Sequence, residues 1–507
     1  MEITLTFGIA VGGIFLSLAL FKIRHRIRQF LKAFLLWTNK HFVYPPLLRR
    51  HRYLGPWSRA DVLLQSVYFA MNVLCLIYKV SSISKAGLRA ANLSLINLIP
   101  LLSGPSFNVL ADLLGISLSK FRRFHRLAGV MSFVLLAFHV ITVVVSRTSF
   151  SLHVPENLWG LIGGSSLCLL MLSLPLLREL SYEVFIRTHQ ALAVLAAYSI
   201  WRHLVSQPLL PRIYIYIFAG ICLLTFLLQY GFIIWRNKAV GRSFPRASIT
   251  HMNDTVKIRL TLSRPLKVKA GQHIGLWTPV SFWSFWQSHP FVVTSWSEGE
   301  QSALDLFIEP RQGFTQKLLE YSKSNRPPRL ALFSGPHGTS APVGEYETVL
   351  MVASGFGIAA QLSYLRQLIY GYNACKTRTR RVHLVWQLET LDIGIAVESL
   401  LNDALADDTL DEGYILSISI YIQSGKADRV PFGRRAIVYS GTADLTTILQ
   451  EEAEGKYIKR VQEETEERGG MLVMVSGTDQ LRDQLRDEVR GYLDDKVSLW
   501  ELEYQPA

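Results

Sequence analysis

Long apolar runs separated by short polar and basic segments occupy the chain up to about residue 240. Seven of these runs are long enough to cross a bilayer as helices, because roughly 20 apolar residues span its hydrocarbon core. They cover residues 3–21, 60–80, 90–113, 124–146, 157–177, 184–205 and 212–235. The pattern predicts a multi-pass α-helical membrane domain with seven spans.

The pattern changes from about residue 245 to short strands punctuated by glycine and proline. Residues 255–262 alternate apolar and polar positions, which predicts a strand of a small antiparallel β-barrel that continues to about residue 340. Beyond it, apolar strands such as 348–353 and 382–386 alternate with helices. That alternation is typical of a parallel sheet of the dinucleotide-binding kind.

Charge is divided unevenly between the two parts. Residues 1–240 hold 24 Lys and Arg against 6 Asp and Glu, whereas the remainder holds 29 against 33. The net charge of +14 therefore belongs to the membrane part, where basic loops mark the cytoplasmic side. No soluble segment shows a clustered basic face, so nucleic acid is not expected as a partner.

Basic clusters at 22–28, 49–52, 120–126 and 236–238 all fall on one side of a seven-span topology. By the positive-inside rule that side is the cytoplasm, so the residues after 240 are expected in the cytosol. The first run is interpreted as an anchor, because its basic cluster follows it. A cleaved signal peptide remains the alternative for this run.

Four histidines form two pairs with the same spacing. His125 and His139 are 14 residues apart, as are His189 and His203. Fourteen residues of helix bring a side chain back to nearly the same face about 21 Å further along. Two such parallel helices would form two bis-imidazole haem sites, with His125 and His189 inside and His139 and His203 outside. The alternative is four separate histidines, each hydrogen-bonded between helices.

Residues 289–295, HPFVVTS, resemble the HPF(S/T)xxS flavin motif of ferric-chelate reductases and NADPH oxidases. The resemblance implies FAD contacts by His289, Pro290, Phe291, Thr294 and Ser295. The histidine pairs also match the transmembrane haem domain of this family.

Three further segments resemble motifs of the same family. Residues 311–315 resemble the turn and helix start that hold the FAD pyrophosphate, residues 335–338 resemble the GPYG turn, and residues 354–358 resemble the GGxGI phosphate turn for NADPH. The implied cofactor-binding residues are Arg311, Gly313, Thr315, Gly335, Gly338, Gly355 and Gly357. The resemblance covers roughly residues 55–505.

The expected organisation has four parts. Residues 1–55 are an N-terminal transmembrane anchor and basic linker, and residues 56–240 are a ferric reductase-like haem domain. Residues 241–342 are an FAD-binding β-barrel, and residues 343–507 are an NADPH-binding α/β domain.

Several positions depart from the family pattern. His337 replaces the GPYG tyrosine, Ser354 replaces the first glycine of the phosphate turn, and Ala359 replaces its threonine. Ser476-Gly-Thr stands where the family has Cys-Gly-Pro, and Tyr504 is the nearest candidate for the C-terminal aromatic residue. These changes bear on nucleotide affinity and hydride transfer, and they leave the expected fold and haem ligands unchanged.

The resemblance implies electron transfer from cytosolic NADPH through FAD and two b-type haems to an external acceptor, with no side-chain acid, base or nucleophile required. The expected acceptor is a ferric or cupric chelate, siderophores included, whose reduction supplies a metal transporter. Superoxide production from oxygen is the alternative, and a non-catalytic haem scaffold is the third. The plasma membrane is the expected location, with an internal, vacuolar membrane as the alternative.

Overall fold

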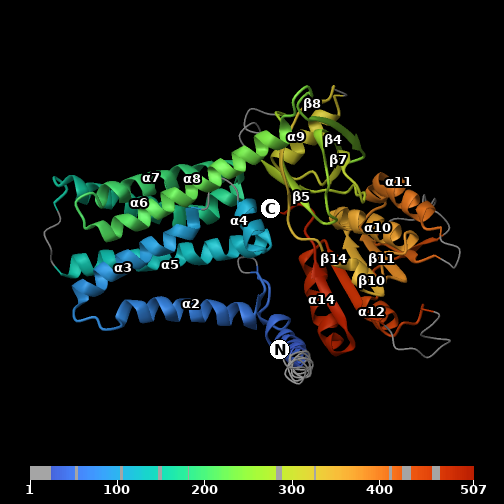
Figure 1. Ribbon diagram of the computed structural model, residues 1–507, viewed down its shortest axis with the longest axis horizontal. Helices are drawn as coiled ribbons and strands as arrows, with labels where there is room; N and C mark the ends of the chain where they lie inside the picture. The colour runs from blue at the N-terminus through green and yellow to red at the C-terminus, as the bar shows by residue number, and fades with distance from the viewer. Residues whose placement is uncertain are drawn as a thin grey trace, which may run out of the picture.

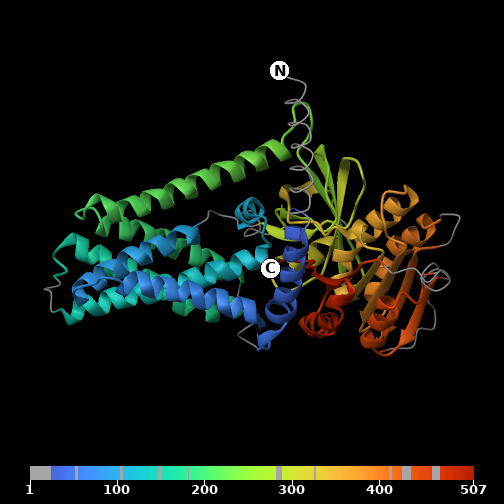
Figure 2. The ribbon, with the colours of Figure 1, turned by 60° about the horizontal axis from the view of Figure 1, so that its bottom comes forward.

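The computed structural model describes residues 24, 26–51, 55–102, 107–146, 151–180, 182–280, 288–324, 327–409, 414–424, 435–458 and 469–506. A bundle of long helices lies at one end of the molecule, and two domains that contain β-sheets lie at the other (Figure 1). The first expected span, residues 3–21, lies outside the described residues. Residues 26–38 form a helix that runs crosswise to the bundle near the junction (Figure 2).

The bundle helices lie side by side along a common direction in both views (Figures 1 and 2). They are α2 (Arg59–Ile77), α3 (Ile83–Leu98), α5 (Leu118–Val145), α6 (Pro155–Leu180), α7 (Tyr182–His203) and α8 (Leu209–Asn237). Within the described residues, α2, α5 and α8 are each long and apolar enough to cross a membrane. The protein is therefore an integral membrane protein, while the expected count of seven spans is not confirmed.

The expected span over residues 90–113 is wrong. Helix α3 ends at Leu98, a 3₁₀ turn follows, and a separate short helix α4 covers Phe107–Leu114. Pro100 has no N–H group to continue the α-helical hydrogen bonds, and the chain passes there into the 3₁₀ helix Ile99–Leu102. Helix α4 lies at the junction between the bundle and the β-containing domains (Figure 1).

The first β-containing domain consists of two antiparallel sheets that share one apolar core. One sheet has the order β7-β4-β3-β8, the other has the order β6-β5-β9, and a bridge between Val293 and Leu306 links them. The strands are β3 (Arg246–Met252), β4 (Thr255–Leu266), β5 (His273–Trp277), β6 (His289–Val292), β7 (Gln301–Ile308), β8 (Arg329–Leu330) and β9 (Leu332–His337), with helix α9 (Phe314–Ser322) beside them. The antiparallel barrel expected from the alternating pattern is confirmed.

The second domain is a parallel sheet with the order β13-β12-β11-β10-β14-β15. Its strands are β10 (Thr348–Ser354), β11 (Arg381–Leu388), β12 (Leu416–Ile422), β13 (Ala436–Ser440), β14 (Met471–Ser476) and β15 (Val497–Glu501). Helices α10 (Ile358–Asn373) and α11 (Asp392–Asp407) pack on one face, and α12 (Leu445–Ala453) and α14 (Asp479–Gly491) pack on the other. The strand order reverses between β10 and β14, and ligands of such sheets bind where the order reverses.

Candidate functional site

The outer pair of histidines is oriented by backbone carbonyls of neighbouring helices. The Nδ1 atom of His139 lies 3.0 Å from the carbonyl oxygen of Gly87, and that of His203 lies 2.7 Å from the carbonyl oxygen of Glu156. The alternative expectation of hydrogen bonds between helices is correct for Nδ1, but these bonds leave Nε2 of each ring available to a metal.

Two glycines allow the helices to approach this closely. A Cβ atom on Gly87 would lie 2.0 Å from the Thr142 hydroxyl oxygen, and one on Gly160 would lie 2.8 Å from Nδ1 of His203. Helix α3 therefore packs directly against α5, and α6 packs directly against α7. The glycines bring the carbonyl acceptors within reach of the imidazoles.

The inner pair consists of His125 and His189, whose ring centroids are 6.1 Å apart. Two imidazoles that bind one metal ion through bonds of roughly 2 Å have ring centres about 6 Å apart. The Nδ1 atom of His189 is buried and has no hydrogen-bond partner in the described part of the chain. The ring of Phe107 lies 4.9 Å from that of His125. The separation and the unpartnered nitrogen fit a metal centre shared by the two rings.

The β6 strand presents the expected flavin motif along one edge of the barrel. The His289 ring stacks on Phe314, with centroids 4.0 Å apart and planes 5° apart, and Phe291 also faces Phe314. Burial lowers the pKa of His289 to about 4, so its ring is neutral at physiological pH. Pro290 lies opposite Gly275 in the neighbouring strand β5.

Thr294 and Ser295 contact the protein backbone through their hydroxyl groups. The Thr294 hydroxyl donates to the carbonyl oxygen of Asp305 at 2.9 Å, and the Ser295 hydroxyl accepts from the N–H of Asp305 at 3.1 Å. These bonds join the end of the flavin motif to β7. Direct contacts of the two hydroxyls with FAD stay a prediction.

The expected pyrophosphate turn leads directly into helix α9. Gly313 has a φ of 78° at the helix start, and the Arg311 N–H donates to the Thr315 hydroxyl at 2.7 Å. A Cβ atom on Gly313 would lie 3.0 Å from a carboxylate oxygen of Glu183 at the start of α7. A carboxylate beside the positive end of a helix is electrostatically favourable, as a pyrophosphate would be.

The C-terminal segment of the chain lies beside the flavin-motif strand β6 and the turn before α9. Tyr504 accepts from the Val292 N–H through its carbonyl at 3.2 Å, and its hydroxyl lies 2.8 Å from the Arg311 guanidinium. The C-terminal aromatic candidate therefore lies beside the flavin strand. A cavity of about 320 Å³ opens between the two domains here, lined by Arg311, Gly477, Thr478, Asp479, Arg482, Glu503, Tyr504 and Gln505.

Two atoms in this cavity have unused hydrogen-bonding capacity. Nε of Arg482 and Oε1 of Gln505 are buried without a partner among the described residues. The cavity brings the guanidinium groups of Arg311 and Arg482, which can bind phosphate, beside the carboxylates of Asp479 and Glu503. Arg482 did not emerge from the sequence, because an arginine on an amphipathic surface helix carries no motif.

The two glycine turns of the α/β domain lie side by side at the ends of β10 and β14. The Ser354 hydroxyl accepts from the Thr478 N–H at 2.8 Å, so the serine that replaces a family glycine links the turns. Gly355 has a φ of 51° and open space where a Cβ would be, whereas a Cβ on Gly357 would lie 2.4 Å from the Ser476 carbonyl oxygen. Gly355 therefore borders open space that a ligand could occupy, whereas Gly357 allows the turn after β10 to pack against the turn after β14.

The turn that resembles GPYG contacts the membrane domain. Gly335 and Gly338 have φ values of 109° and 92°. Asp112 of α4 accepts from the Gly338 N–H at 2.9 Å and lies 2.6 Å from Nδ1 of His337. Sequence reasoning missed Asp112, although a carboxylate inside an expected membrane span is costly and could have signalled the break.

The geometry defines a membrane protein with two histidine pairs, a flavin-type barrel and a nucleotide-type sheet. Residues 88–200 match the ferric reductase like transmembrane component. Residues 242–355 match an FAD-binding domain, and residues 346–468 match the ferric reductase NAD binding domain. The three matches follow one another along residues 88–468, so the chain is similar in domain order to ferric reductases.

Several curated proteins are similar to this chain. Ferric reductase transmembrane component 3 of Saccharomyces cerevisiae is 30% identical over 57% of this chain and 40% of its own length. Ferric/cupric reductase transmembrane component 2 of the same yeast is 29% identical over 58% and 41%. Probable cell surface ferric reductase kap2 of Aspergillus oryzae is 27% identical over 56% and 41%. The matches thus span about two fifths of the length of these relatives.

Gly160→Ala is expected to disturb the outer histidine pair, because its Cβ would lie 2.8 Å from Nδ1 of His203. The ring must then move from the Glu156 carbonyl, and haem per chain, measured from the reduced pyridine spectrum, should fall to about half. Gly164→Ala on the same helix has open space around its Cβ and should keep the wild-type value. Equal haem content in the two variants would contradict a haem-binding role for His203.

Gly357→Ala and Gly355→Trp are expected to act differently. The first should lower the Tm of the α/β domain by roughly 3–10 °C, because its Cβ would overlap the Ser476 carbonyl. The second should raise the KM for NADPH at least about tenfold by filling the open side of the turn, with a smaller change in Tm. A thermal scan and a steady-state titration measure both. The same KM for the Gly355 variant and the wild type would exclude this turn from nucleotide binding.

Proposed function

We propose that the protein transfers electrons across its membrane, from cytosolic NADPH to a metal chelate on the opposite side, as a ferric-chelate reductase. The observation that carries the proposal is the placement of two facing histidine pairs along helices α5 and α7. They occur in one chain with a flavin-type strand and a nucleotide-type switch point. The names of the relatives, which include ferric and ferric/cupric reductases, support a metal chelate as acceptor.

The membrane domain would hold two b-type haems. His125 and His189 would ligate the inner one through the rings that lie 6.1 Å apart, and His139 and His203 would ligate the outer one. The six bundle helices would cross the membrane, with the β-containing domains in the cytosol. Glu156 and Gly87 orient the outer rings through their carbonyls.

The soluble domains would hold the other two cofactors. His289, Pro290 and Phe291 would line the flavin, with Thr294 and Ser295 at the end of the strand. The turn from Arg311 through Gly313 to Thr315 would face its pyrophosphate, Gly335 and Gly338 would shape the turn between the domains, and Gly355 and Gly357 would form the NADPH phosphate turn.

When bound, NADPH supplies a hydride, and FAD and the haems carry the electrons onward singly. The role of this chain is to hold these groups at fixed separations and to exclude water, so no side-chain acid or base is required. The word "cell surface" in the name of the Aspergillus oryzae relative supports a plasma-membrane location. Ferric or cupric chelates, siderophores included, would be reduced there for uptake by a metal transporter.

Intact cells that express the protein are expected to reduce an impermeant ferric chelate without external NADPH, because the histidine pairs lead away from the nucleotide site. An impermeant dye that binds Fe²⁺ measures the product, and superoxide dismutase tests for an oxygen-mediated route. Gly355→Trp serves as a control in which weaker NADPH binding should lower the rate. Superoxide production at a rate unaffected by ferric chelate would make the protein an NADPH oxidase instead.

Alanine substitution of any one of the four histidines is expected to remove the haem of its own pair. His125→Ala or His189→Ala should remove the inner haem, and His139→Ala or His203→Ala the outer, each leaving about one haem per chain. FAD content should stay at the wild-type level, because the flavin residues belong to another domain. Normal haem content in any of these variants would contradict the ligand assignment.

A further inference from the structure

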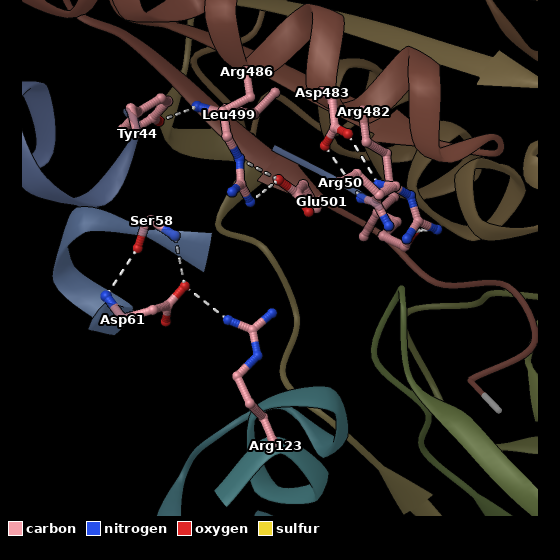
Figure 3. A network of polar contacts seen from close by, with 11 residues as sticks. Tyr44, Arg50, Ser58, Asp61, Arg123, Arg482, Asp483, Arg486, Leu499 and Glu501 are labelled. Atoms are coloured by element: carbon pink, nitrogen blue, oxygen red, sulfur yellow. Dashed lines mark hydrogen bonds and ion pairs between the residues drawn. The ribbon is translucent and has the colours of Figure 1, made fainter. Parts of the chain in front are cut away.

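A segment ahead of α2 lies across the α/β domain. We call it the N-terminal strap; it comprises residues 26–51 and 55–58, including the short strands β1 (Pro46–Leu48) and β2 (Trp57–Ser58). The strap contacts α14 and β15 (Figure 3). Both the strap and these two elements lie outside the segments that match the family domains.

Arg50 is the main ionic contact of the strap. Its Nε and Nη2 atoms donate to the two carboxylate oxygens of Asp483 at 2.9 and 3.1 Å, and its Nη1 atom lies 2.8 Å from Asp479 (Figure 3). A bidentate pair fixes both the distance and the orientation of its partners. Lys40 adds an ion pair with Asp494.

The strap also contacts the α/β domain through backbone hydrogen bonds and apolar packing. The Tyr44 hydroxyl accepts from the Leu499 N–H at 3.1 Å, and Arg490 donates to the Lys40 carbonyl at 3.2 Å. Leu36 and Tyr44 pack against the apolar cluster beneath α14 and β15. The strap is thus bound at several points along its length.

The other end of the strap is joined to the membrane domain. Ser58 caps α2 reciprocally with Asp61, and Asp61 also accepts from Arg123 at 2.7 Å (Figure 3). Arg123 belongs to α5 and lies two residues before His125. The strap therefore connects α14 to the end of the helix that carries an inner histidine.

The ionic contact faces water. A cavity of about 940 Å³ opens beside this contact, and residues of both the strap and α14 line it, among them Arg49, Arg50, His51, Asp479 and Asp483. The Arg50 side chain is 32% exposed. Ion pairs in such a setting weaken as salt is added. The contact of Arg50 with α14 is therefore expected to weaken at high ionic strength.

Helix α14 begins at Asp479, directly after Gly477 and Thr478, which line the cavity beside Arg311. We propose that Arg50 is a positioning residue for the nucleotide site: the strap holds the start of α14, and thereby the Gly477–Thr478 turn, in register with the membrane domain. The proposal rests on the proposed function, because it concerns the rate at which NADPH reduces the flavin.

Arg50→Glu tests the proposal with two readouts. Hydrogen exchange of the α14 amides should become several-fold faster, because the helix start loses its anchor. The anaerobic rate of flavin reduction at saturating NADPH should fall about five-fold, as should the wild-type rate at high salt. Arg49→Glu makes the same charge change at an exposed neighbour and should match the wild type in both. The double variant Arg50→Glu with Asp483→Arg should recover most of the rate.

The outcomes separate the two proposals. If NADPH fails to reduce the flavin of the wild type, the proposed function is wrong, and hydrogen exchange still tests the strap. If the wild type is reduced and Arg50→Glu equals it in rate and exchange, the positioning role is wrong and the proposed function stands. Loss of FAD or haem in Arg50→Glu would show a folding role and would overturn the proposal as well.

Discussion

Imidazole nitrogens inside a lipid-surrounded bundle have no water to bond with, and this constraint organises the membrane domain. His139 and His203 satisfy Nδ1 through carbonyls of adjacent helices, and Gly87 and Gly160 let those helices come close enough. The pairing of α3 with α5 and of α6 with α7 follows from the same contacts. These two bonds use Nδ1 and do not involve Nε2, the nitrogen that could bind a metal.

Hydrogen bonds also explain how the α/β domain accommodates its departures from the family pattern. Ser354 accepts a hydrogen bond from the Thr478 N–H, and the buried Ser476 hydroxyl donates to the Gly357 carbonyl at 2.7 Å. Both replacements therefore join the two turns at the switch point. The turn chemistry differs from the family, while the placement of the turns is maintained by these bonds.

Much of this architecture could be predicted from the sequence because it depends on local periodicity. The apolar runs predicted helices α5 and α7, which carry all four histidines. The alternation of residues 255–262 predicted strand β4. The span over 90–113 failed because averaged hydropathy outweighed two local signals, Pro100 and Asp112. A local sequence pattern is sufficient to predict a helix or strand when the apolar positions of that segment alone determine which of its faces is buried.

Contacts between segments far apart in the sequence could not be predicted from local periodicity. Arg50 and Asp483 are 433 positions apart, and neither belongs to a motif. The role of Gly357 depends on Ser476, 119 positions away, so the glycine pattern alone could not distinguish packing from ligand contact. Such roles become visible only when the fold has brought the partners together.

Basic residues of the N-terminal half also contact the C-terminal half directly. The two halves carry net charges of opposite sign, and Arg50 and Lys40 of the first half pair with aspartates of the second. Asp112 with His337 and Ser119 with Glu503 add polar contacts near the start of α5. These contacts join the membrane domain to both β-containing domains at the end of the bundle that carries His125.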